Sequence, residues 1–112
     1  MVFRKFFSRP AVAEVTPEEV RAKQKTGAAI VDVREQYEWQ EGHIPGAIHI
    51  PLGSLSRRLN ELDSSCEIVT VCRSGRRSIS AAQILQQSGF SQVSSMAGGM
   101  ISWTRQRLPT QR

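Results

Sequence analysis

The chain has 112 residues, of which 39% are hydrophobic and 22% are charged, and its net charge is +5. This length favours a single domain, and the apolar content is too high for an intrinsically disordered chain. No apolar run approaches the roughly 20 residues that span a bilayer, so we expect no integral membrane segment. Glutamates interrupt the basic residues in the middle of the chain, which disfavours a nucleic-acid-binding surface.

The N-terminal segment is basic and aromatic, but it does not have the pattern of a secretory signal. Basic residues interrupt it, so it lacks the continuous apolar stretch of about 7–15 residues that a signal requires. We therefore predict a flexible basic arm over residues 1–13, a folded domain over residues 14–107 and a short tail over residues 108–112. A cytoplasmic location is expected.

The first predicted element is a helix that begins after Thr16 and ends near Gly27. Thr16 and Glu19 have the spacing of a capping box, and Pro17 suits the first helical turn. Residues 28–33 follow as a short apolar run with β-branched side chains, which indicates a buried strand.

The remaining elements alternate between helical and extended patterns. Leucines between residues 52 and 62 recur every three or four positions, which predicts an amphipathic helix. In chain order we expect a helix over 35–41, a strand over 47–50, a helix over 52–62, a strand over 68–71, a helix over 78–87, a strand over 90–95 and a helix over 100–107. This alternation predicts an α/β fold with a parallel sheet, whose ligand site lies beyond the carboxyl ends of the strands.

The segment CRSGRR, from Cys72 to Arg77, joins a predicted strand to a predicted helix. At such a helix N-terminus, backbone N–H groups and nearby arginines stabilise a thiolate and lower a cysteine pKa from about 8.5 to roughly 3.5–7.5. A buried structural cysteine is the plain alternative, but it does not explain three arginines and a glycine in the same loop. The segment therefore predicts that Cys72 is a nucleophile that acts on an anion.

The two cysteines, Cys66 and Cys72, lie at opposite ends of one predicted strand. Six strand residues span about 20 Å at roughly 3.3 Å per residue, whereas a disulfide needs Cα atoms within about 7 Å. We therefore expect two reduced thiols, as in a reducing compartment.

Four motifs occur in order along the chain. They are DVRE at residues 32–35 with Glu38 and Trp39, GHIPGA at residues 42–47, CxxGxR at residues 72–77 and GGxxxW at residues 98–103. Together they resemble the motifs of single-domain rhodaneses, a family of sulfurtransferases, from about Glu14 to Arg105. The resemblance implies a central parallel five-stranded sheet flanked by helices on both faces.

The resemblance also implies a thiosulfate sulfurtransferase that needs no cofactor and no metal. Cys72 would attack the outer sulfur of a donor such as thiosulfate, and a thiophilic acceptor (cyanide or a thiol, including a protein thiol) would remove the sulfur from the resulting persulfide. The loop would bind the anionic donor and cradle the persulfide. The expected substrate-binding residues are Arg73, Ser74, Gly75, Arg76 and Arg77. For Arg77 two roles stay open, namely binding the anion or turning back to brace the loop.

Three further residues are expected to support the loop. Asp32, at a strand end, is predicted to hold backbone N–H groups, and His43 is predicted to anchor a turn, since attack of a thiolate on sulfur needs little proton transfer. For Arg34 two roles stay open, namely pairing with a nearby carboxylate or approaching the substrate. Trp39 and Trp103 are predicted to lie in the core.

Two alternative functions use the same cysteine. Cysteine phosphatases place an arginine six residues after the nucleophile, but here that position is Ser78 and the arginine comes one residue earlier, at Arg77. The other alternative is a persulfide carrier or binding module that serves a partner enzyme without rapid turnover.

Overall fold

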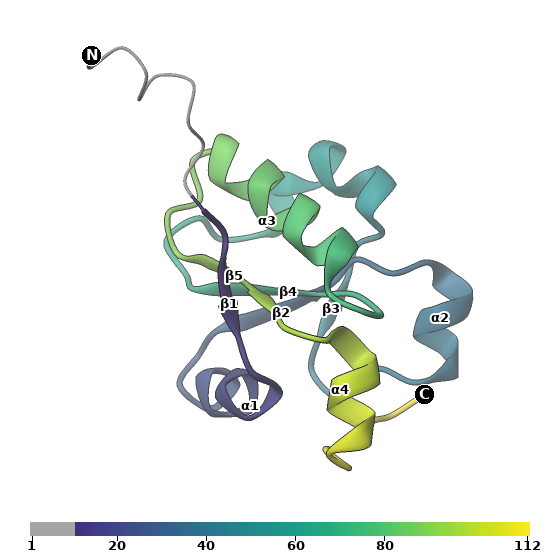
Figure 1. The fold of residues 1–112 in the computed structure, drawn as a ribbon. Helices are drawn as coiled ribbons and strands as arrows, with labels where there is room; N and C mark the ends of the chain where they lie inside the picture. The colour runs from purple at the N-terminus through teal and green to yellow at the C-terminus, as the bar shows by residue number, and fades with distance from the viewer. Residues whose placement is uncertain (1–10) are drawn as a thin grey trace.

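The computed structural model describes residues 11–112 and contains one five-stranded parallel sheet (Figure 1). The strands lie side by side in the order β1-β5-β4-β2-β3. Their bounds are β1 (Ala13–Val15), β2 (Ala29–Asp32), β3 (Ile48–His49), β4 (Ile68–Val71) and β5 (Val93–Met96). The predicted α/β class and the parallel five-stranded sheet are therefore confirmed.

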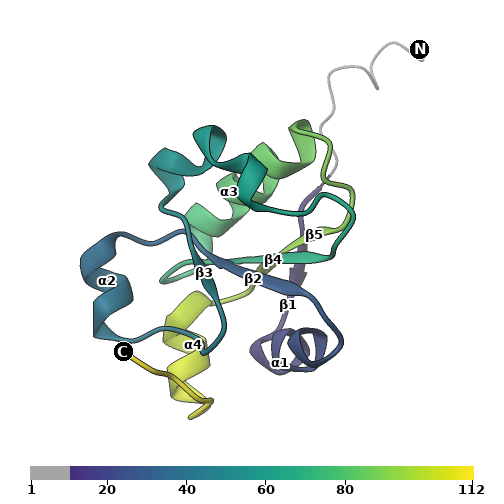
Figure 2. The ribbon, with the colours of Figure 1, turned by 180° about the vertical axis from the view of Figure 1, so that it is seen from behind.

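Helices cover both faces of this sheet, as Figures 1 and 2 show from opposite sides. On one face lie α3 and two short 3-10 helices, and on the other lie α1 and α4, while α2 lies beyond the edge at β3. The bounds are α1 (Pro17–Lys25), α2 (Gln36–Glu41), η2 (Leu52–Arg57), η3 (Leu59–Glu61), α3 (Arg76–Gln87) and α4 (Gly99–Arg105).

The core consists of two apolar clusters, one on each face of the sheet. Ile68 packs on the α3 side with Leu55 and Leu85, whereas Val69 packs on the other side with Trp103. Neighbouring residues of β4 thus point to opposite faces, and all four are buried. A central parallel strand that is buried on both faces needs apolar residues at nearly every position, which explains its continuous β-branched run.

Helix α1 begins as the sequence predicts. Thr16 Oγ1 accepts a hydrogen bond from the Glu19 backbone N–H at 3.2 Å, and Glu19 Oε1 accepts one from the Thr16 backbone N–H at 2.9 Å. This reciprocal capping box satisfies two N–H groups that a helix start otherwise leaves without partners.

The predicted helix over residues 52–62 is wrong as an α-helix. The chain forms η2 and η3, separated at Arg58, whose backbone N–H bonds to the Leu55 carbonyl three residues earlier. Glycine and serines in η2 have weak α-helical propensity, and the tighter 3-10 turn still packs the predicted leucines on the core. The leucine spacing alone does not distinguish the two kinds of helix.

Both ends of the described chain contribute more structure than expected. The last residue of the predicted arm over residues 1–13, Ala13, already belongs to β1 and pairs with β5. Residues 1–10 of the predicted arm lie outside the described part of the chain. At the other end, Gln111 and His43 exchange backbone hydrogen bonds of 2.9 and 2.8 Å, and Leu108 packs on the core. Within residues 11–112 no helix is long and apolar enough to cross a membrane.

Candidate active site

Cys72 lies directly after β4, near the centre of the sheet at its carboxyl edge. The chain turns through Gly75 and enters α3 at Arg76. Gly75 has a φ of +104°, a left-handed conformation that disfavours residues with a Cβ atom. This glycine therefore allows the backbone to curl back toward the cysteine sulfur.

The sulfur of Cys72 is surrounded by hydrogen-bond donors. The Gly75 backbone N–H donates to Sγ at 3.1 Å, and the hydroxyl of Ser78 lies 3.4 Å from Sγ. Burial raises the pKa of the Cys72 thiol, but hydrogen bonds from the Ser78 hydroxyl and from the backbone N–H groups of Ser78, Gly75 and Ser74 outweigh it, so the pKa is lowered overall. The site favours a thiolate on a residue that is only 1% exposed.

The Ser78 side chain is itself held in a buried polar network. Its Oγ lies 2.7 Å from Ser95 Oγ on β5, and the Thr70 hydroxyl donates to the Ser78 carbonyl at 2.7 Å. These contacts fix Ser78 beside the sulfur. Sequence reasoning did not find Ser78 or Ser95 as site residues, because a serine carries no signal until the fold places it next to the cysteine sulfur.

The three loop arginines have different surroundings. Arg73 and Arg76 are exposed, whereas Arg77 donates two hydrogen bonds to Glu38 on α2, of 2.7 and 2.9 Å. The hydrogen bonds from Arg77 are the main reason why the pKa of Glu38 falls to about 2, and the same pairing raises the pKa of Arg77. Of the two roles predicted for Arg77, bracing the loop is the one that these contacts support.

The end of β2 holds a buried ion pair. Arg34 Nε and Nη2 donate to the Asp32 carboxylate at 2.8–3.1 Å, and the Arg34 backbone N–H donates to Asp32 Oδ1 at 3.0 Å. Arg34 Nη2 also donates to the Gly42 carbonyl at 2.7 Å. Asp32 therefore holds a backbone N–H as predicted, and Arg34 pairs with a carboxylate, one of its two predicted roles.

His43 lies in the turn after α2, as predicted. Its Nδ1 is 2.9 Å from the Trp39 carbonyl oxygen, and its ring stacks on Trp39 with centroids 3.5 Å apart. Trp39 also stacks on His49, at 4.7 Å. The prediction that Trp39 lies in the core is wrong, because α2 lies beyond the sheet edge and Trp39 is only half-buried, whereas Trp103 is 1% exposed and does lie in the core.

The start of α4 closes the loop from the other side. The Met100 backbone N–H donates to the Cys72 carbonyl at 2.8 Å, and the Ile101 N–H donates to the Arg73 carbonyl at 3.1 Å. A Cβ atom at Gly99 would collide with both of these carbonyl groups. The GGxxxW motif thus brings a helix start into direct contact with the residue that carries the sulfur.

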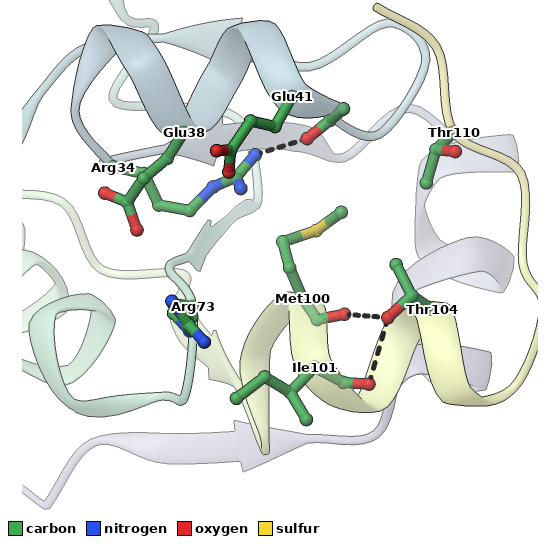
Figure 3. Close-up of a pocket in the computed structure, with 9 residues that line it drawn as sticks. Arg34, Glu38, Glu41, Arg73, Met100, Ile101, Thr104 and Thr110 are labelled. Carbon is green, nitrogen blue, oxygen red and sulfur yellow. Dashed lines mark hydrogen bonds between the residues drawn. The ribbon is translucent and has the colours of Figure 1, made fainter.

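A cavity of about 280 Å³ opens beside this loop (Figure 3). Its walls come from Arg34 and the helix α2, from Arg73 in the loop, from α4 and from the C-terminal tail at Thr110. Within residues 11–112 no group of three or more histidine, cysteine or acidic side chains is placed to hold a metal ion. Cys66 and Cys72 are both free thiols.

Comparison with known sequences identifies relatives along most of the chain. YrkF of Bacillus subtilis, named as a sulfur carrier protein, is 48% identical over 75 residues, which are 67% of this chain and 40% of YrkF. YtwF of the same organism, named as a sulfurtransferase, is 40% identical over 71% of this chain and 77% of its own length. The thiosulfate sulfurtransferase GlpE of Pseudomonas aeruginosa is 38% identical over 80% of this chain and 81% of GlpE.

Solved structures share the fold. A rhodanese-related protein from Thermoplasma volcanium superposes with a TM-score of 0.82 at 26% identity, over 88% of this chain and 97% of that one. The Bacillus anthracis protein CoADR-RHD superposes with a TM-score of 0.78 at 34% identity, over 82% of this chain and 16% of that one. The relatives support a sulfurtransferase or sulfur carrier role. Because the family model of the rhodanese-like domain matches residues 16–106, this chain belongs to the rhodanese-like domain family.

Proposed function

We propose that the protein is a sulfurtransferase that moves a sulfane sulfur from a donor such as thiosulfate to a thiophilic acceptor through a persulfide on Cys72. The observation that carries this proposal is the convergence of the Gly75 N–H and the Ser78 hydroxyl on the sulfur of Cys72. These donors lower the thiol pKa and thus favour the nucleophilic thiolate. The thiosulfate sulfurtransferase name of the GlpE relatives supports the choice of donor.

In the first step the Cys72 thiolate attacks the outer sulfur of thiosulfate. The bond from Cys72 Sγ to that sulfur forms, the sulfur–sulfur bond of thiosulfate breaks, and sulfite leaves with the electron pair. In this proposal Arg73 and Arg76, which are exposed, attract the sulfonate end of the donor. Backbone N–H groups around the sulfur then stabilise the anionic persulfide.

In the second step a nucleophilic acceptor attacks the outer sulfur of the persulfide. Cyanide leaves as thiocyanate, or a thiol leaves as a persulfide, and Cys72 returns to the thiolate. Thiosulfate supplies the sulfane sulfur that converts the Cys72 thiolate to a persulfide, and the acceptor removes it, so the enzyme is unchanged over the full cycle and needs no external electron carrier. The lowered pKa of Cys72 also makes it a good leaving group here.

The test is thiocyanate formation from thiosulfate and cyanide, combined with intact mass spectrometry after incubation with thiosulfate alone. We expect turnover and the gain of one sulfur atom per chain, both absent in Cys72→Ser. Cys66→Ser is the matched control, because Cys66 is half-buried and hydrogen-bonds to Asp63, outside the loop. Full activity in Cys72→Ser would disprove the mechanism.

A persulfide carrier is the second candidate, and one finding favours it: the relative YrkF is named as a sulfur carrier protein. A carrier would hold the persulfide on the same Cys72 and deliver it to a protein thiol. In that case intact mass would show the added sulfur from some donor, while turnover with thiosulfate and cyanide would be negligible.

The phosphatase alternative is disfavoured by the loop contacts. The Arg77 guanidinium bonds to Glu38, and Ser78, at the position of the phosphatase arginine, bonds to the cysteine sulfur and to Ser95. Hydrolysis of an aryl phosphate at a rate matching sulfur transfer would revive the phosphatase interpretation.

We also propose a cytoplasmic location for the protein. The two free thiols support this location.

A further inference from the structure

A second cavity, of about 180 Å³, lies on the face of the sheet that α1 and α4 cover (Figures 1 and 2). Among residues 11–112 its lining shares no residue with the cavity beside the Cys72 loop. The tail borders both cavities, because Pro109 lines this one and Thr110 lines the other. The residues that form the walls of the second cavity are Arg21, Gln24, Lys25, Pro45, Trp103 and Pro109.

One side of this cavity is apolar, and its side-chain donors already have partners. The Trp103 Nε1–H donates to the Pro109 carbonyl at 2.8 Å, and the Gln24 side-chain amide donates to the Pro45 carbonyl at 2.7 Å. Trp103 is 1% exposed and packs in the core, so it forms the buried side of the cavity. A ligand therefore meets mainly the carbon surface of the indole and of the two proline rings here.

The charged groups of the lining are both cations. Arg21 and Lys25 are four residues apart on α1, and side chains at that spacing lie next to each other on one face of a helix. The ion pairs found within residues 11–112 include neither of these residues. No acidic side chain in the described part of the chain lines the cavity. Two adjacent positive charges beside an apolar wall attract an anion and repel an ammonium group.

The size of the cavity suits a molecule with a single ring. An apolar cavity of about 150 Å³ is large enough for a benzene molecule. The guanidinium group of arginine stacks well on aromatic faces, and Arg21 is half-buried in the wall. An aromatic ring therefore gains contacts in this cavity that a short aliphatic chain does not.

We propose that this cavity is a binding site for a small aromatic carboxylate. The ring of the ligand lies against Trp103 and the two prolines, and its carboxylate lies at Arg21 and Lys25. The site shares no residue with the Cys72 loop among those that the structure describes. The inference therefore goes beyond the proposed function and does not depend on sulfur transfer.

The experiment titrates the isotopically labelled protein with four probes and follows its amide and indole N–H signals by NMR. The probes are benzoate, benzamide as the neutral ring, benzylamine as the cationic ring, and acetate as the carboxylate without a ring. The chain has two tryptophans. The Trp103 indole reports on the cavity, and the Trp39 indole, outside its lining, is the internal reference. Trp39→Phe assigns the two indole signals.

Two variants remove one cation each, namely Arg21→Gln and Lys25→Gln. Arg57→Gln is the matched control, because Arg57 is an exposed arginine on η2 that does not line the cavity. None of these three arginine and lysine residues belongs to the loop from Cys72 to Arg77.

We expect benzoate to shift the Trp103 indole signal and to saturate at millimolar concentrations, as suits a ligand of so few atoms. Benzamide should bind at least about twofold more weakly, and benzylamine and acetate should give no saturable shift. Arg21→Gln and Lys25→Gln should each weaken benzoate about two- to fivefold, the effect of one exposed ion pair, whereas Arg57→Gln should bind it as the wild-type protein does. Equal affinities for benzoate and benzamide, shifts that rise without saturation, or shifts centred on the Cys72 loop would each overturn the inference.

Discussion

Two strands end side by side at the carboxyl edge of the sheet, and their polar groups are arranged in opposite ways. After β2, Asp32 and Arg34 pair with each other and are 1% and 5% exposed. After β4, hydrogen-bond donors converge on Cys72, while Arg73 remains exposed without an ion pair among residues 11–112. The first region uses its charges to hold the backbone, and the second leaves the Arg73 charge exposed to solvent. The role of a charged residue at a strand end therefore has to be inferred from the groups that its side chain contacts.

The sharpest test of this contrast is Cys72→Ser. Because the thiolate is the proposed nucleophile, sulfur transfer should fall to background, whereas the free energy of unfolding should change little, since serine is close in size to cysteine. Thiocyanate formation and urea unfolding measure the two quantities. A variant that unfolds far more easily would show that Cys72 matters to the fold as well.

The second largest effect is expected for Asp32→Asn, which leaves the buried Arg34 charge without its carboxylate. Breaking a buried ion pair typically costs about 3–5 kcal/mol of stability. The matched control is Glu61→Gln, which breaks the exposed pair with Arg58 and should cost about 0.2–1 kcal/mol. Urea denaturation of both variants checks the difference, and equal costs would contradict the structural role of Asp32.

A smaller loss of stability is expected for Glu38→Gln, which weakens the hydrogen bonds from Arg77 that connect α2 to the start of α3. Losing hydrogen bonds to a charged group should cost about 1.5–3 kcal/mol near neutral pH. The pKa of Glu38 is about 2 in the folded protein against its ordinary value of 4.5. The pairing therefore contributes fully above pH 4.5, and its contribution is lost as the pH falls toward 2.

The matching measurement is the stability difference between wild-type protein and Glu38→Gln at several pH values. This difference should shrink as the pH is lowered from 5 toward 2. A difference that stays constant over that range would show that the Glu38 carboxylate is not the group involved.

The smallest effect is expected for Ser78→Ala, which removes a hydroxyl that stabilises the thiolate. The pKa of Cys72 should rise, so less thiolate is present at neutral pH. One hydrogen bond contributes about 0.5–1.5 kcal/mol, so persulfide formation should slow about two- to tenfold, with its pH midpoint moved upward. Ser95→Ala, one hydroxyl further from the sulfur, should shift the midpoint less. An unchanged midpoint in Ser78→Ala would rule out this role.

The sequence was informative where local patterns determine structure. The capping box at Thr16, the buried run of β4 and the loop from Cys72 are each encoded within a few neighbouring residues. The capping box and β4 lie where they were predicted, whereas α3 begins at Arg76, two residues before the predicted helix. The parallel sheet follows from the alternation of strands with helices. The α/β class and the parallel sheet could therefore be predicted from local patterns, whereas strand β1 and the 3-10 helices η2 and η3 could not.

What could not be predicted depends on contacts between distant residues. Glu38 and Arg77 are 39 positions apart, and Ser78 and Ser95 are 17 apart, so no local pattern shows that they meet. The three-residue strand β1 is too short to show an alternating pattern, and its residues are mostly exposed. Trp39 stacks with two histidines beside the sheet edge, because α2 has only six residues and does not cover the sheet.

The pairing of Gln111 with His43 has a practical consequence for handling the protein. It fixes the last residues of the chain against the turn after α2, and Thr110 forms part of the cavity wall. A label or fused partner joined after Arg112 would start two residues from Thr110, which lines the cavity beside the Cys72 loop. Strand β1 runs parallel to β5, so its first residue lies at the amino edge of the sheet, away from the carboxyl edge after which Cys72 lies. Immobilisation through the N-terminal side would leave the reactive edge facing solution.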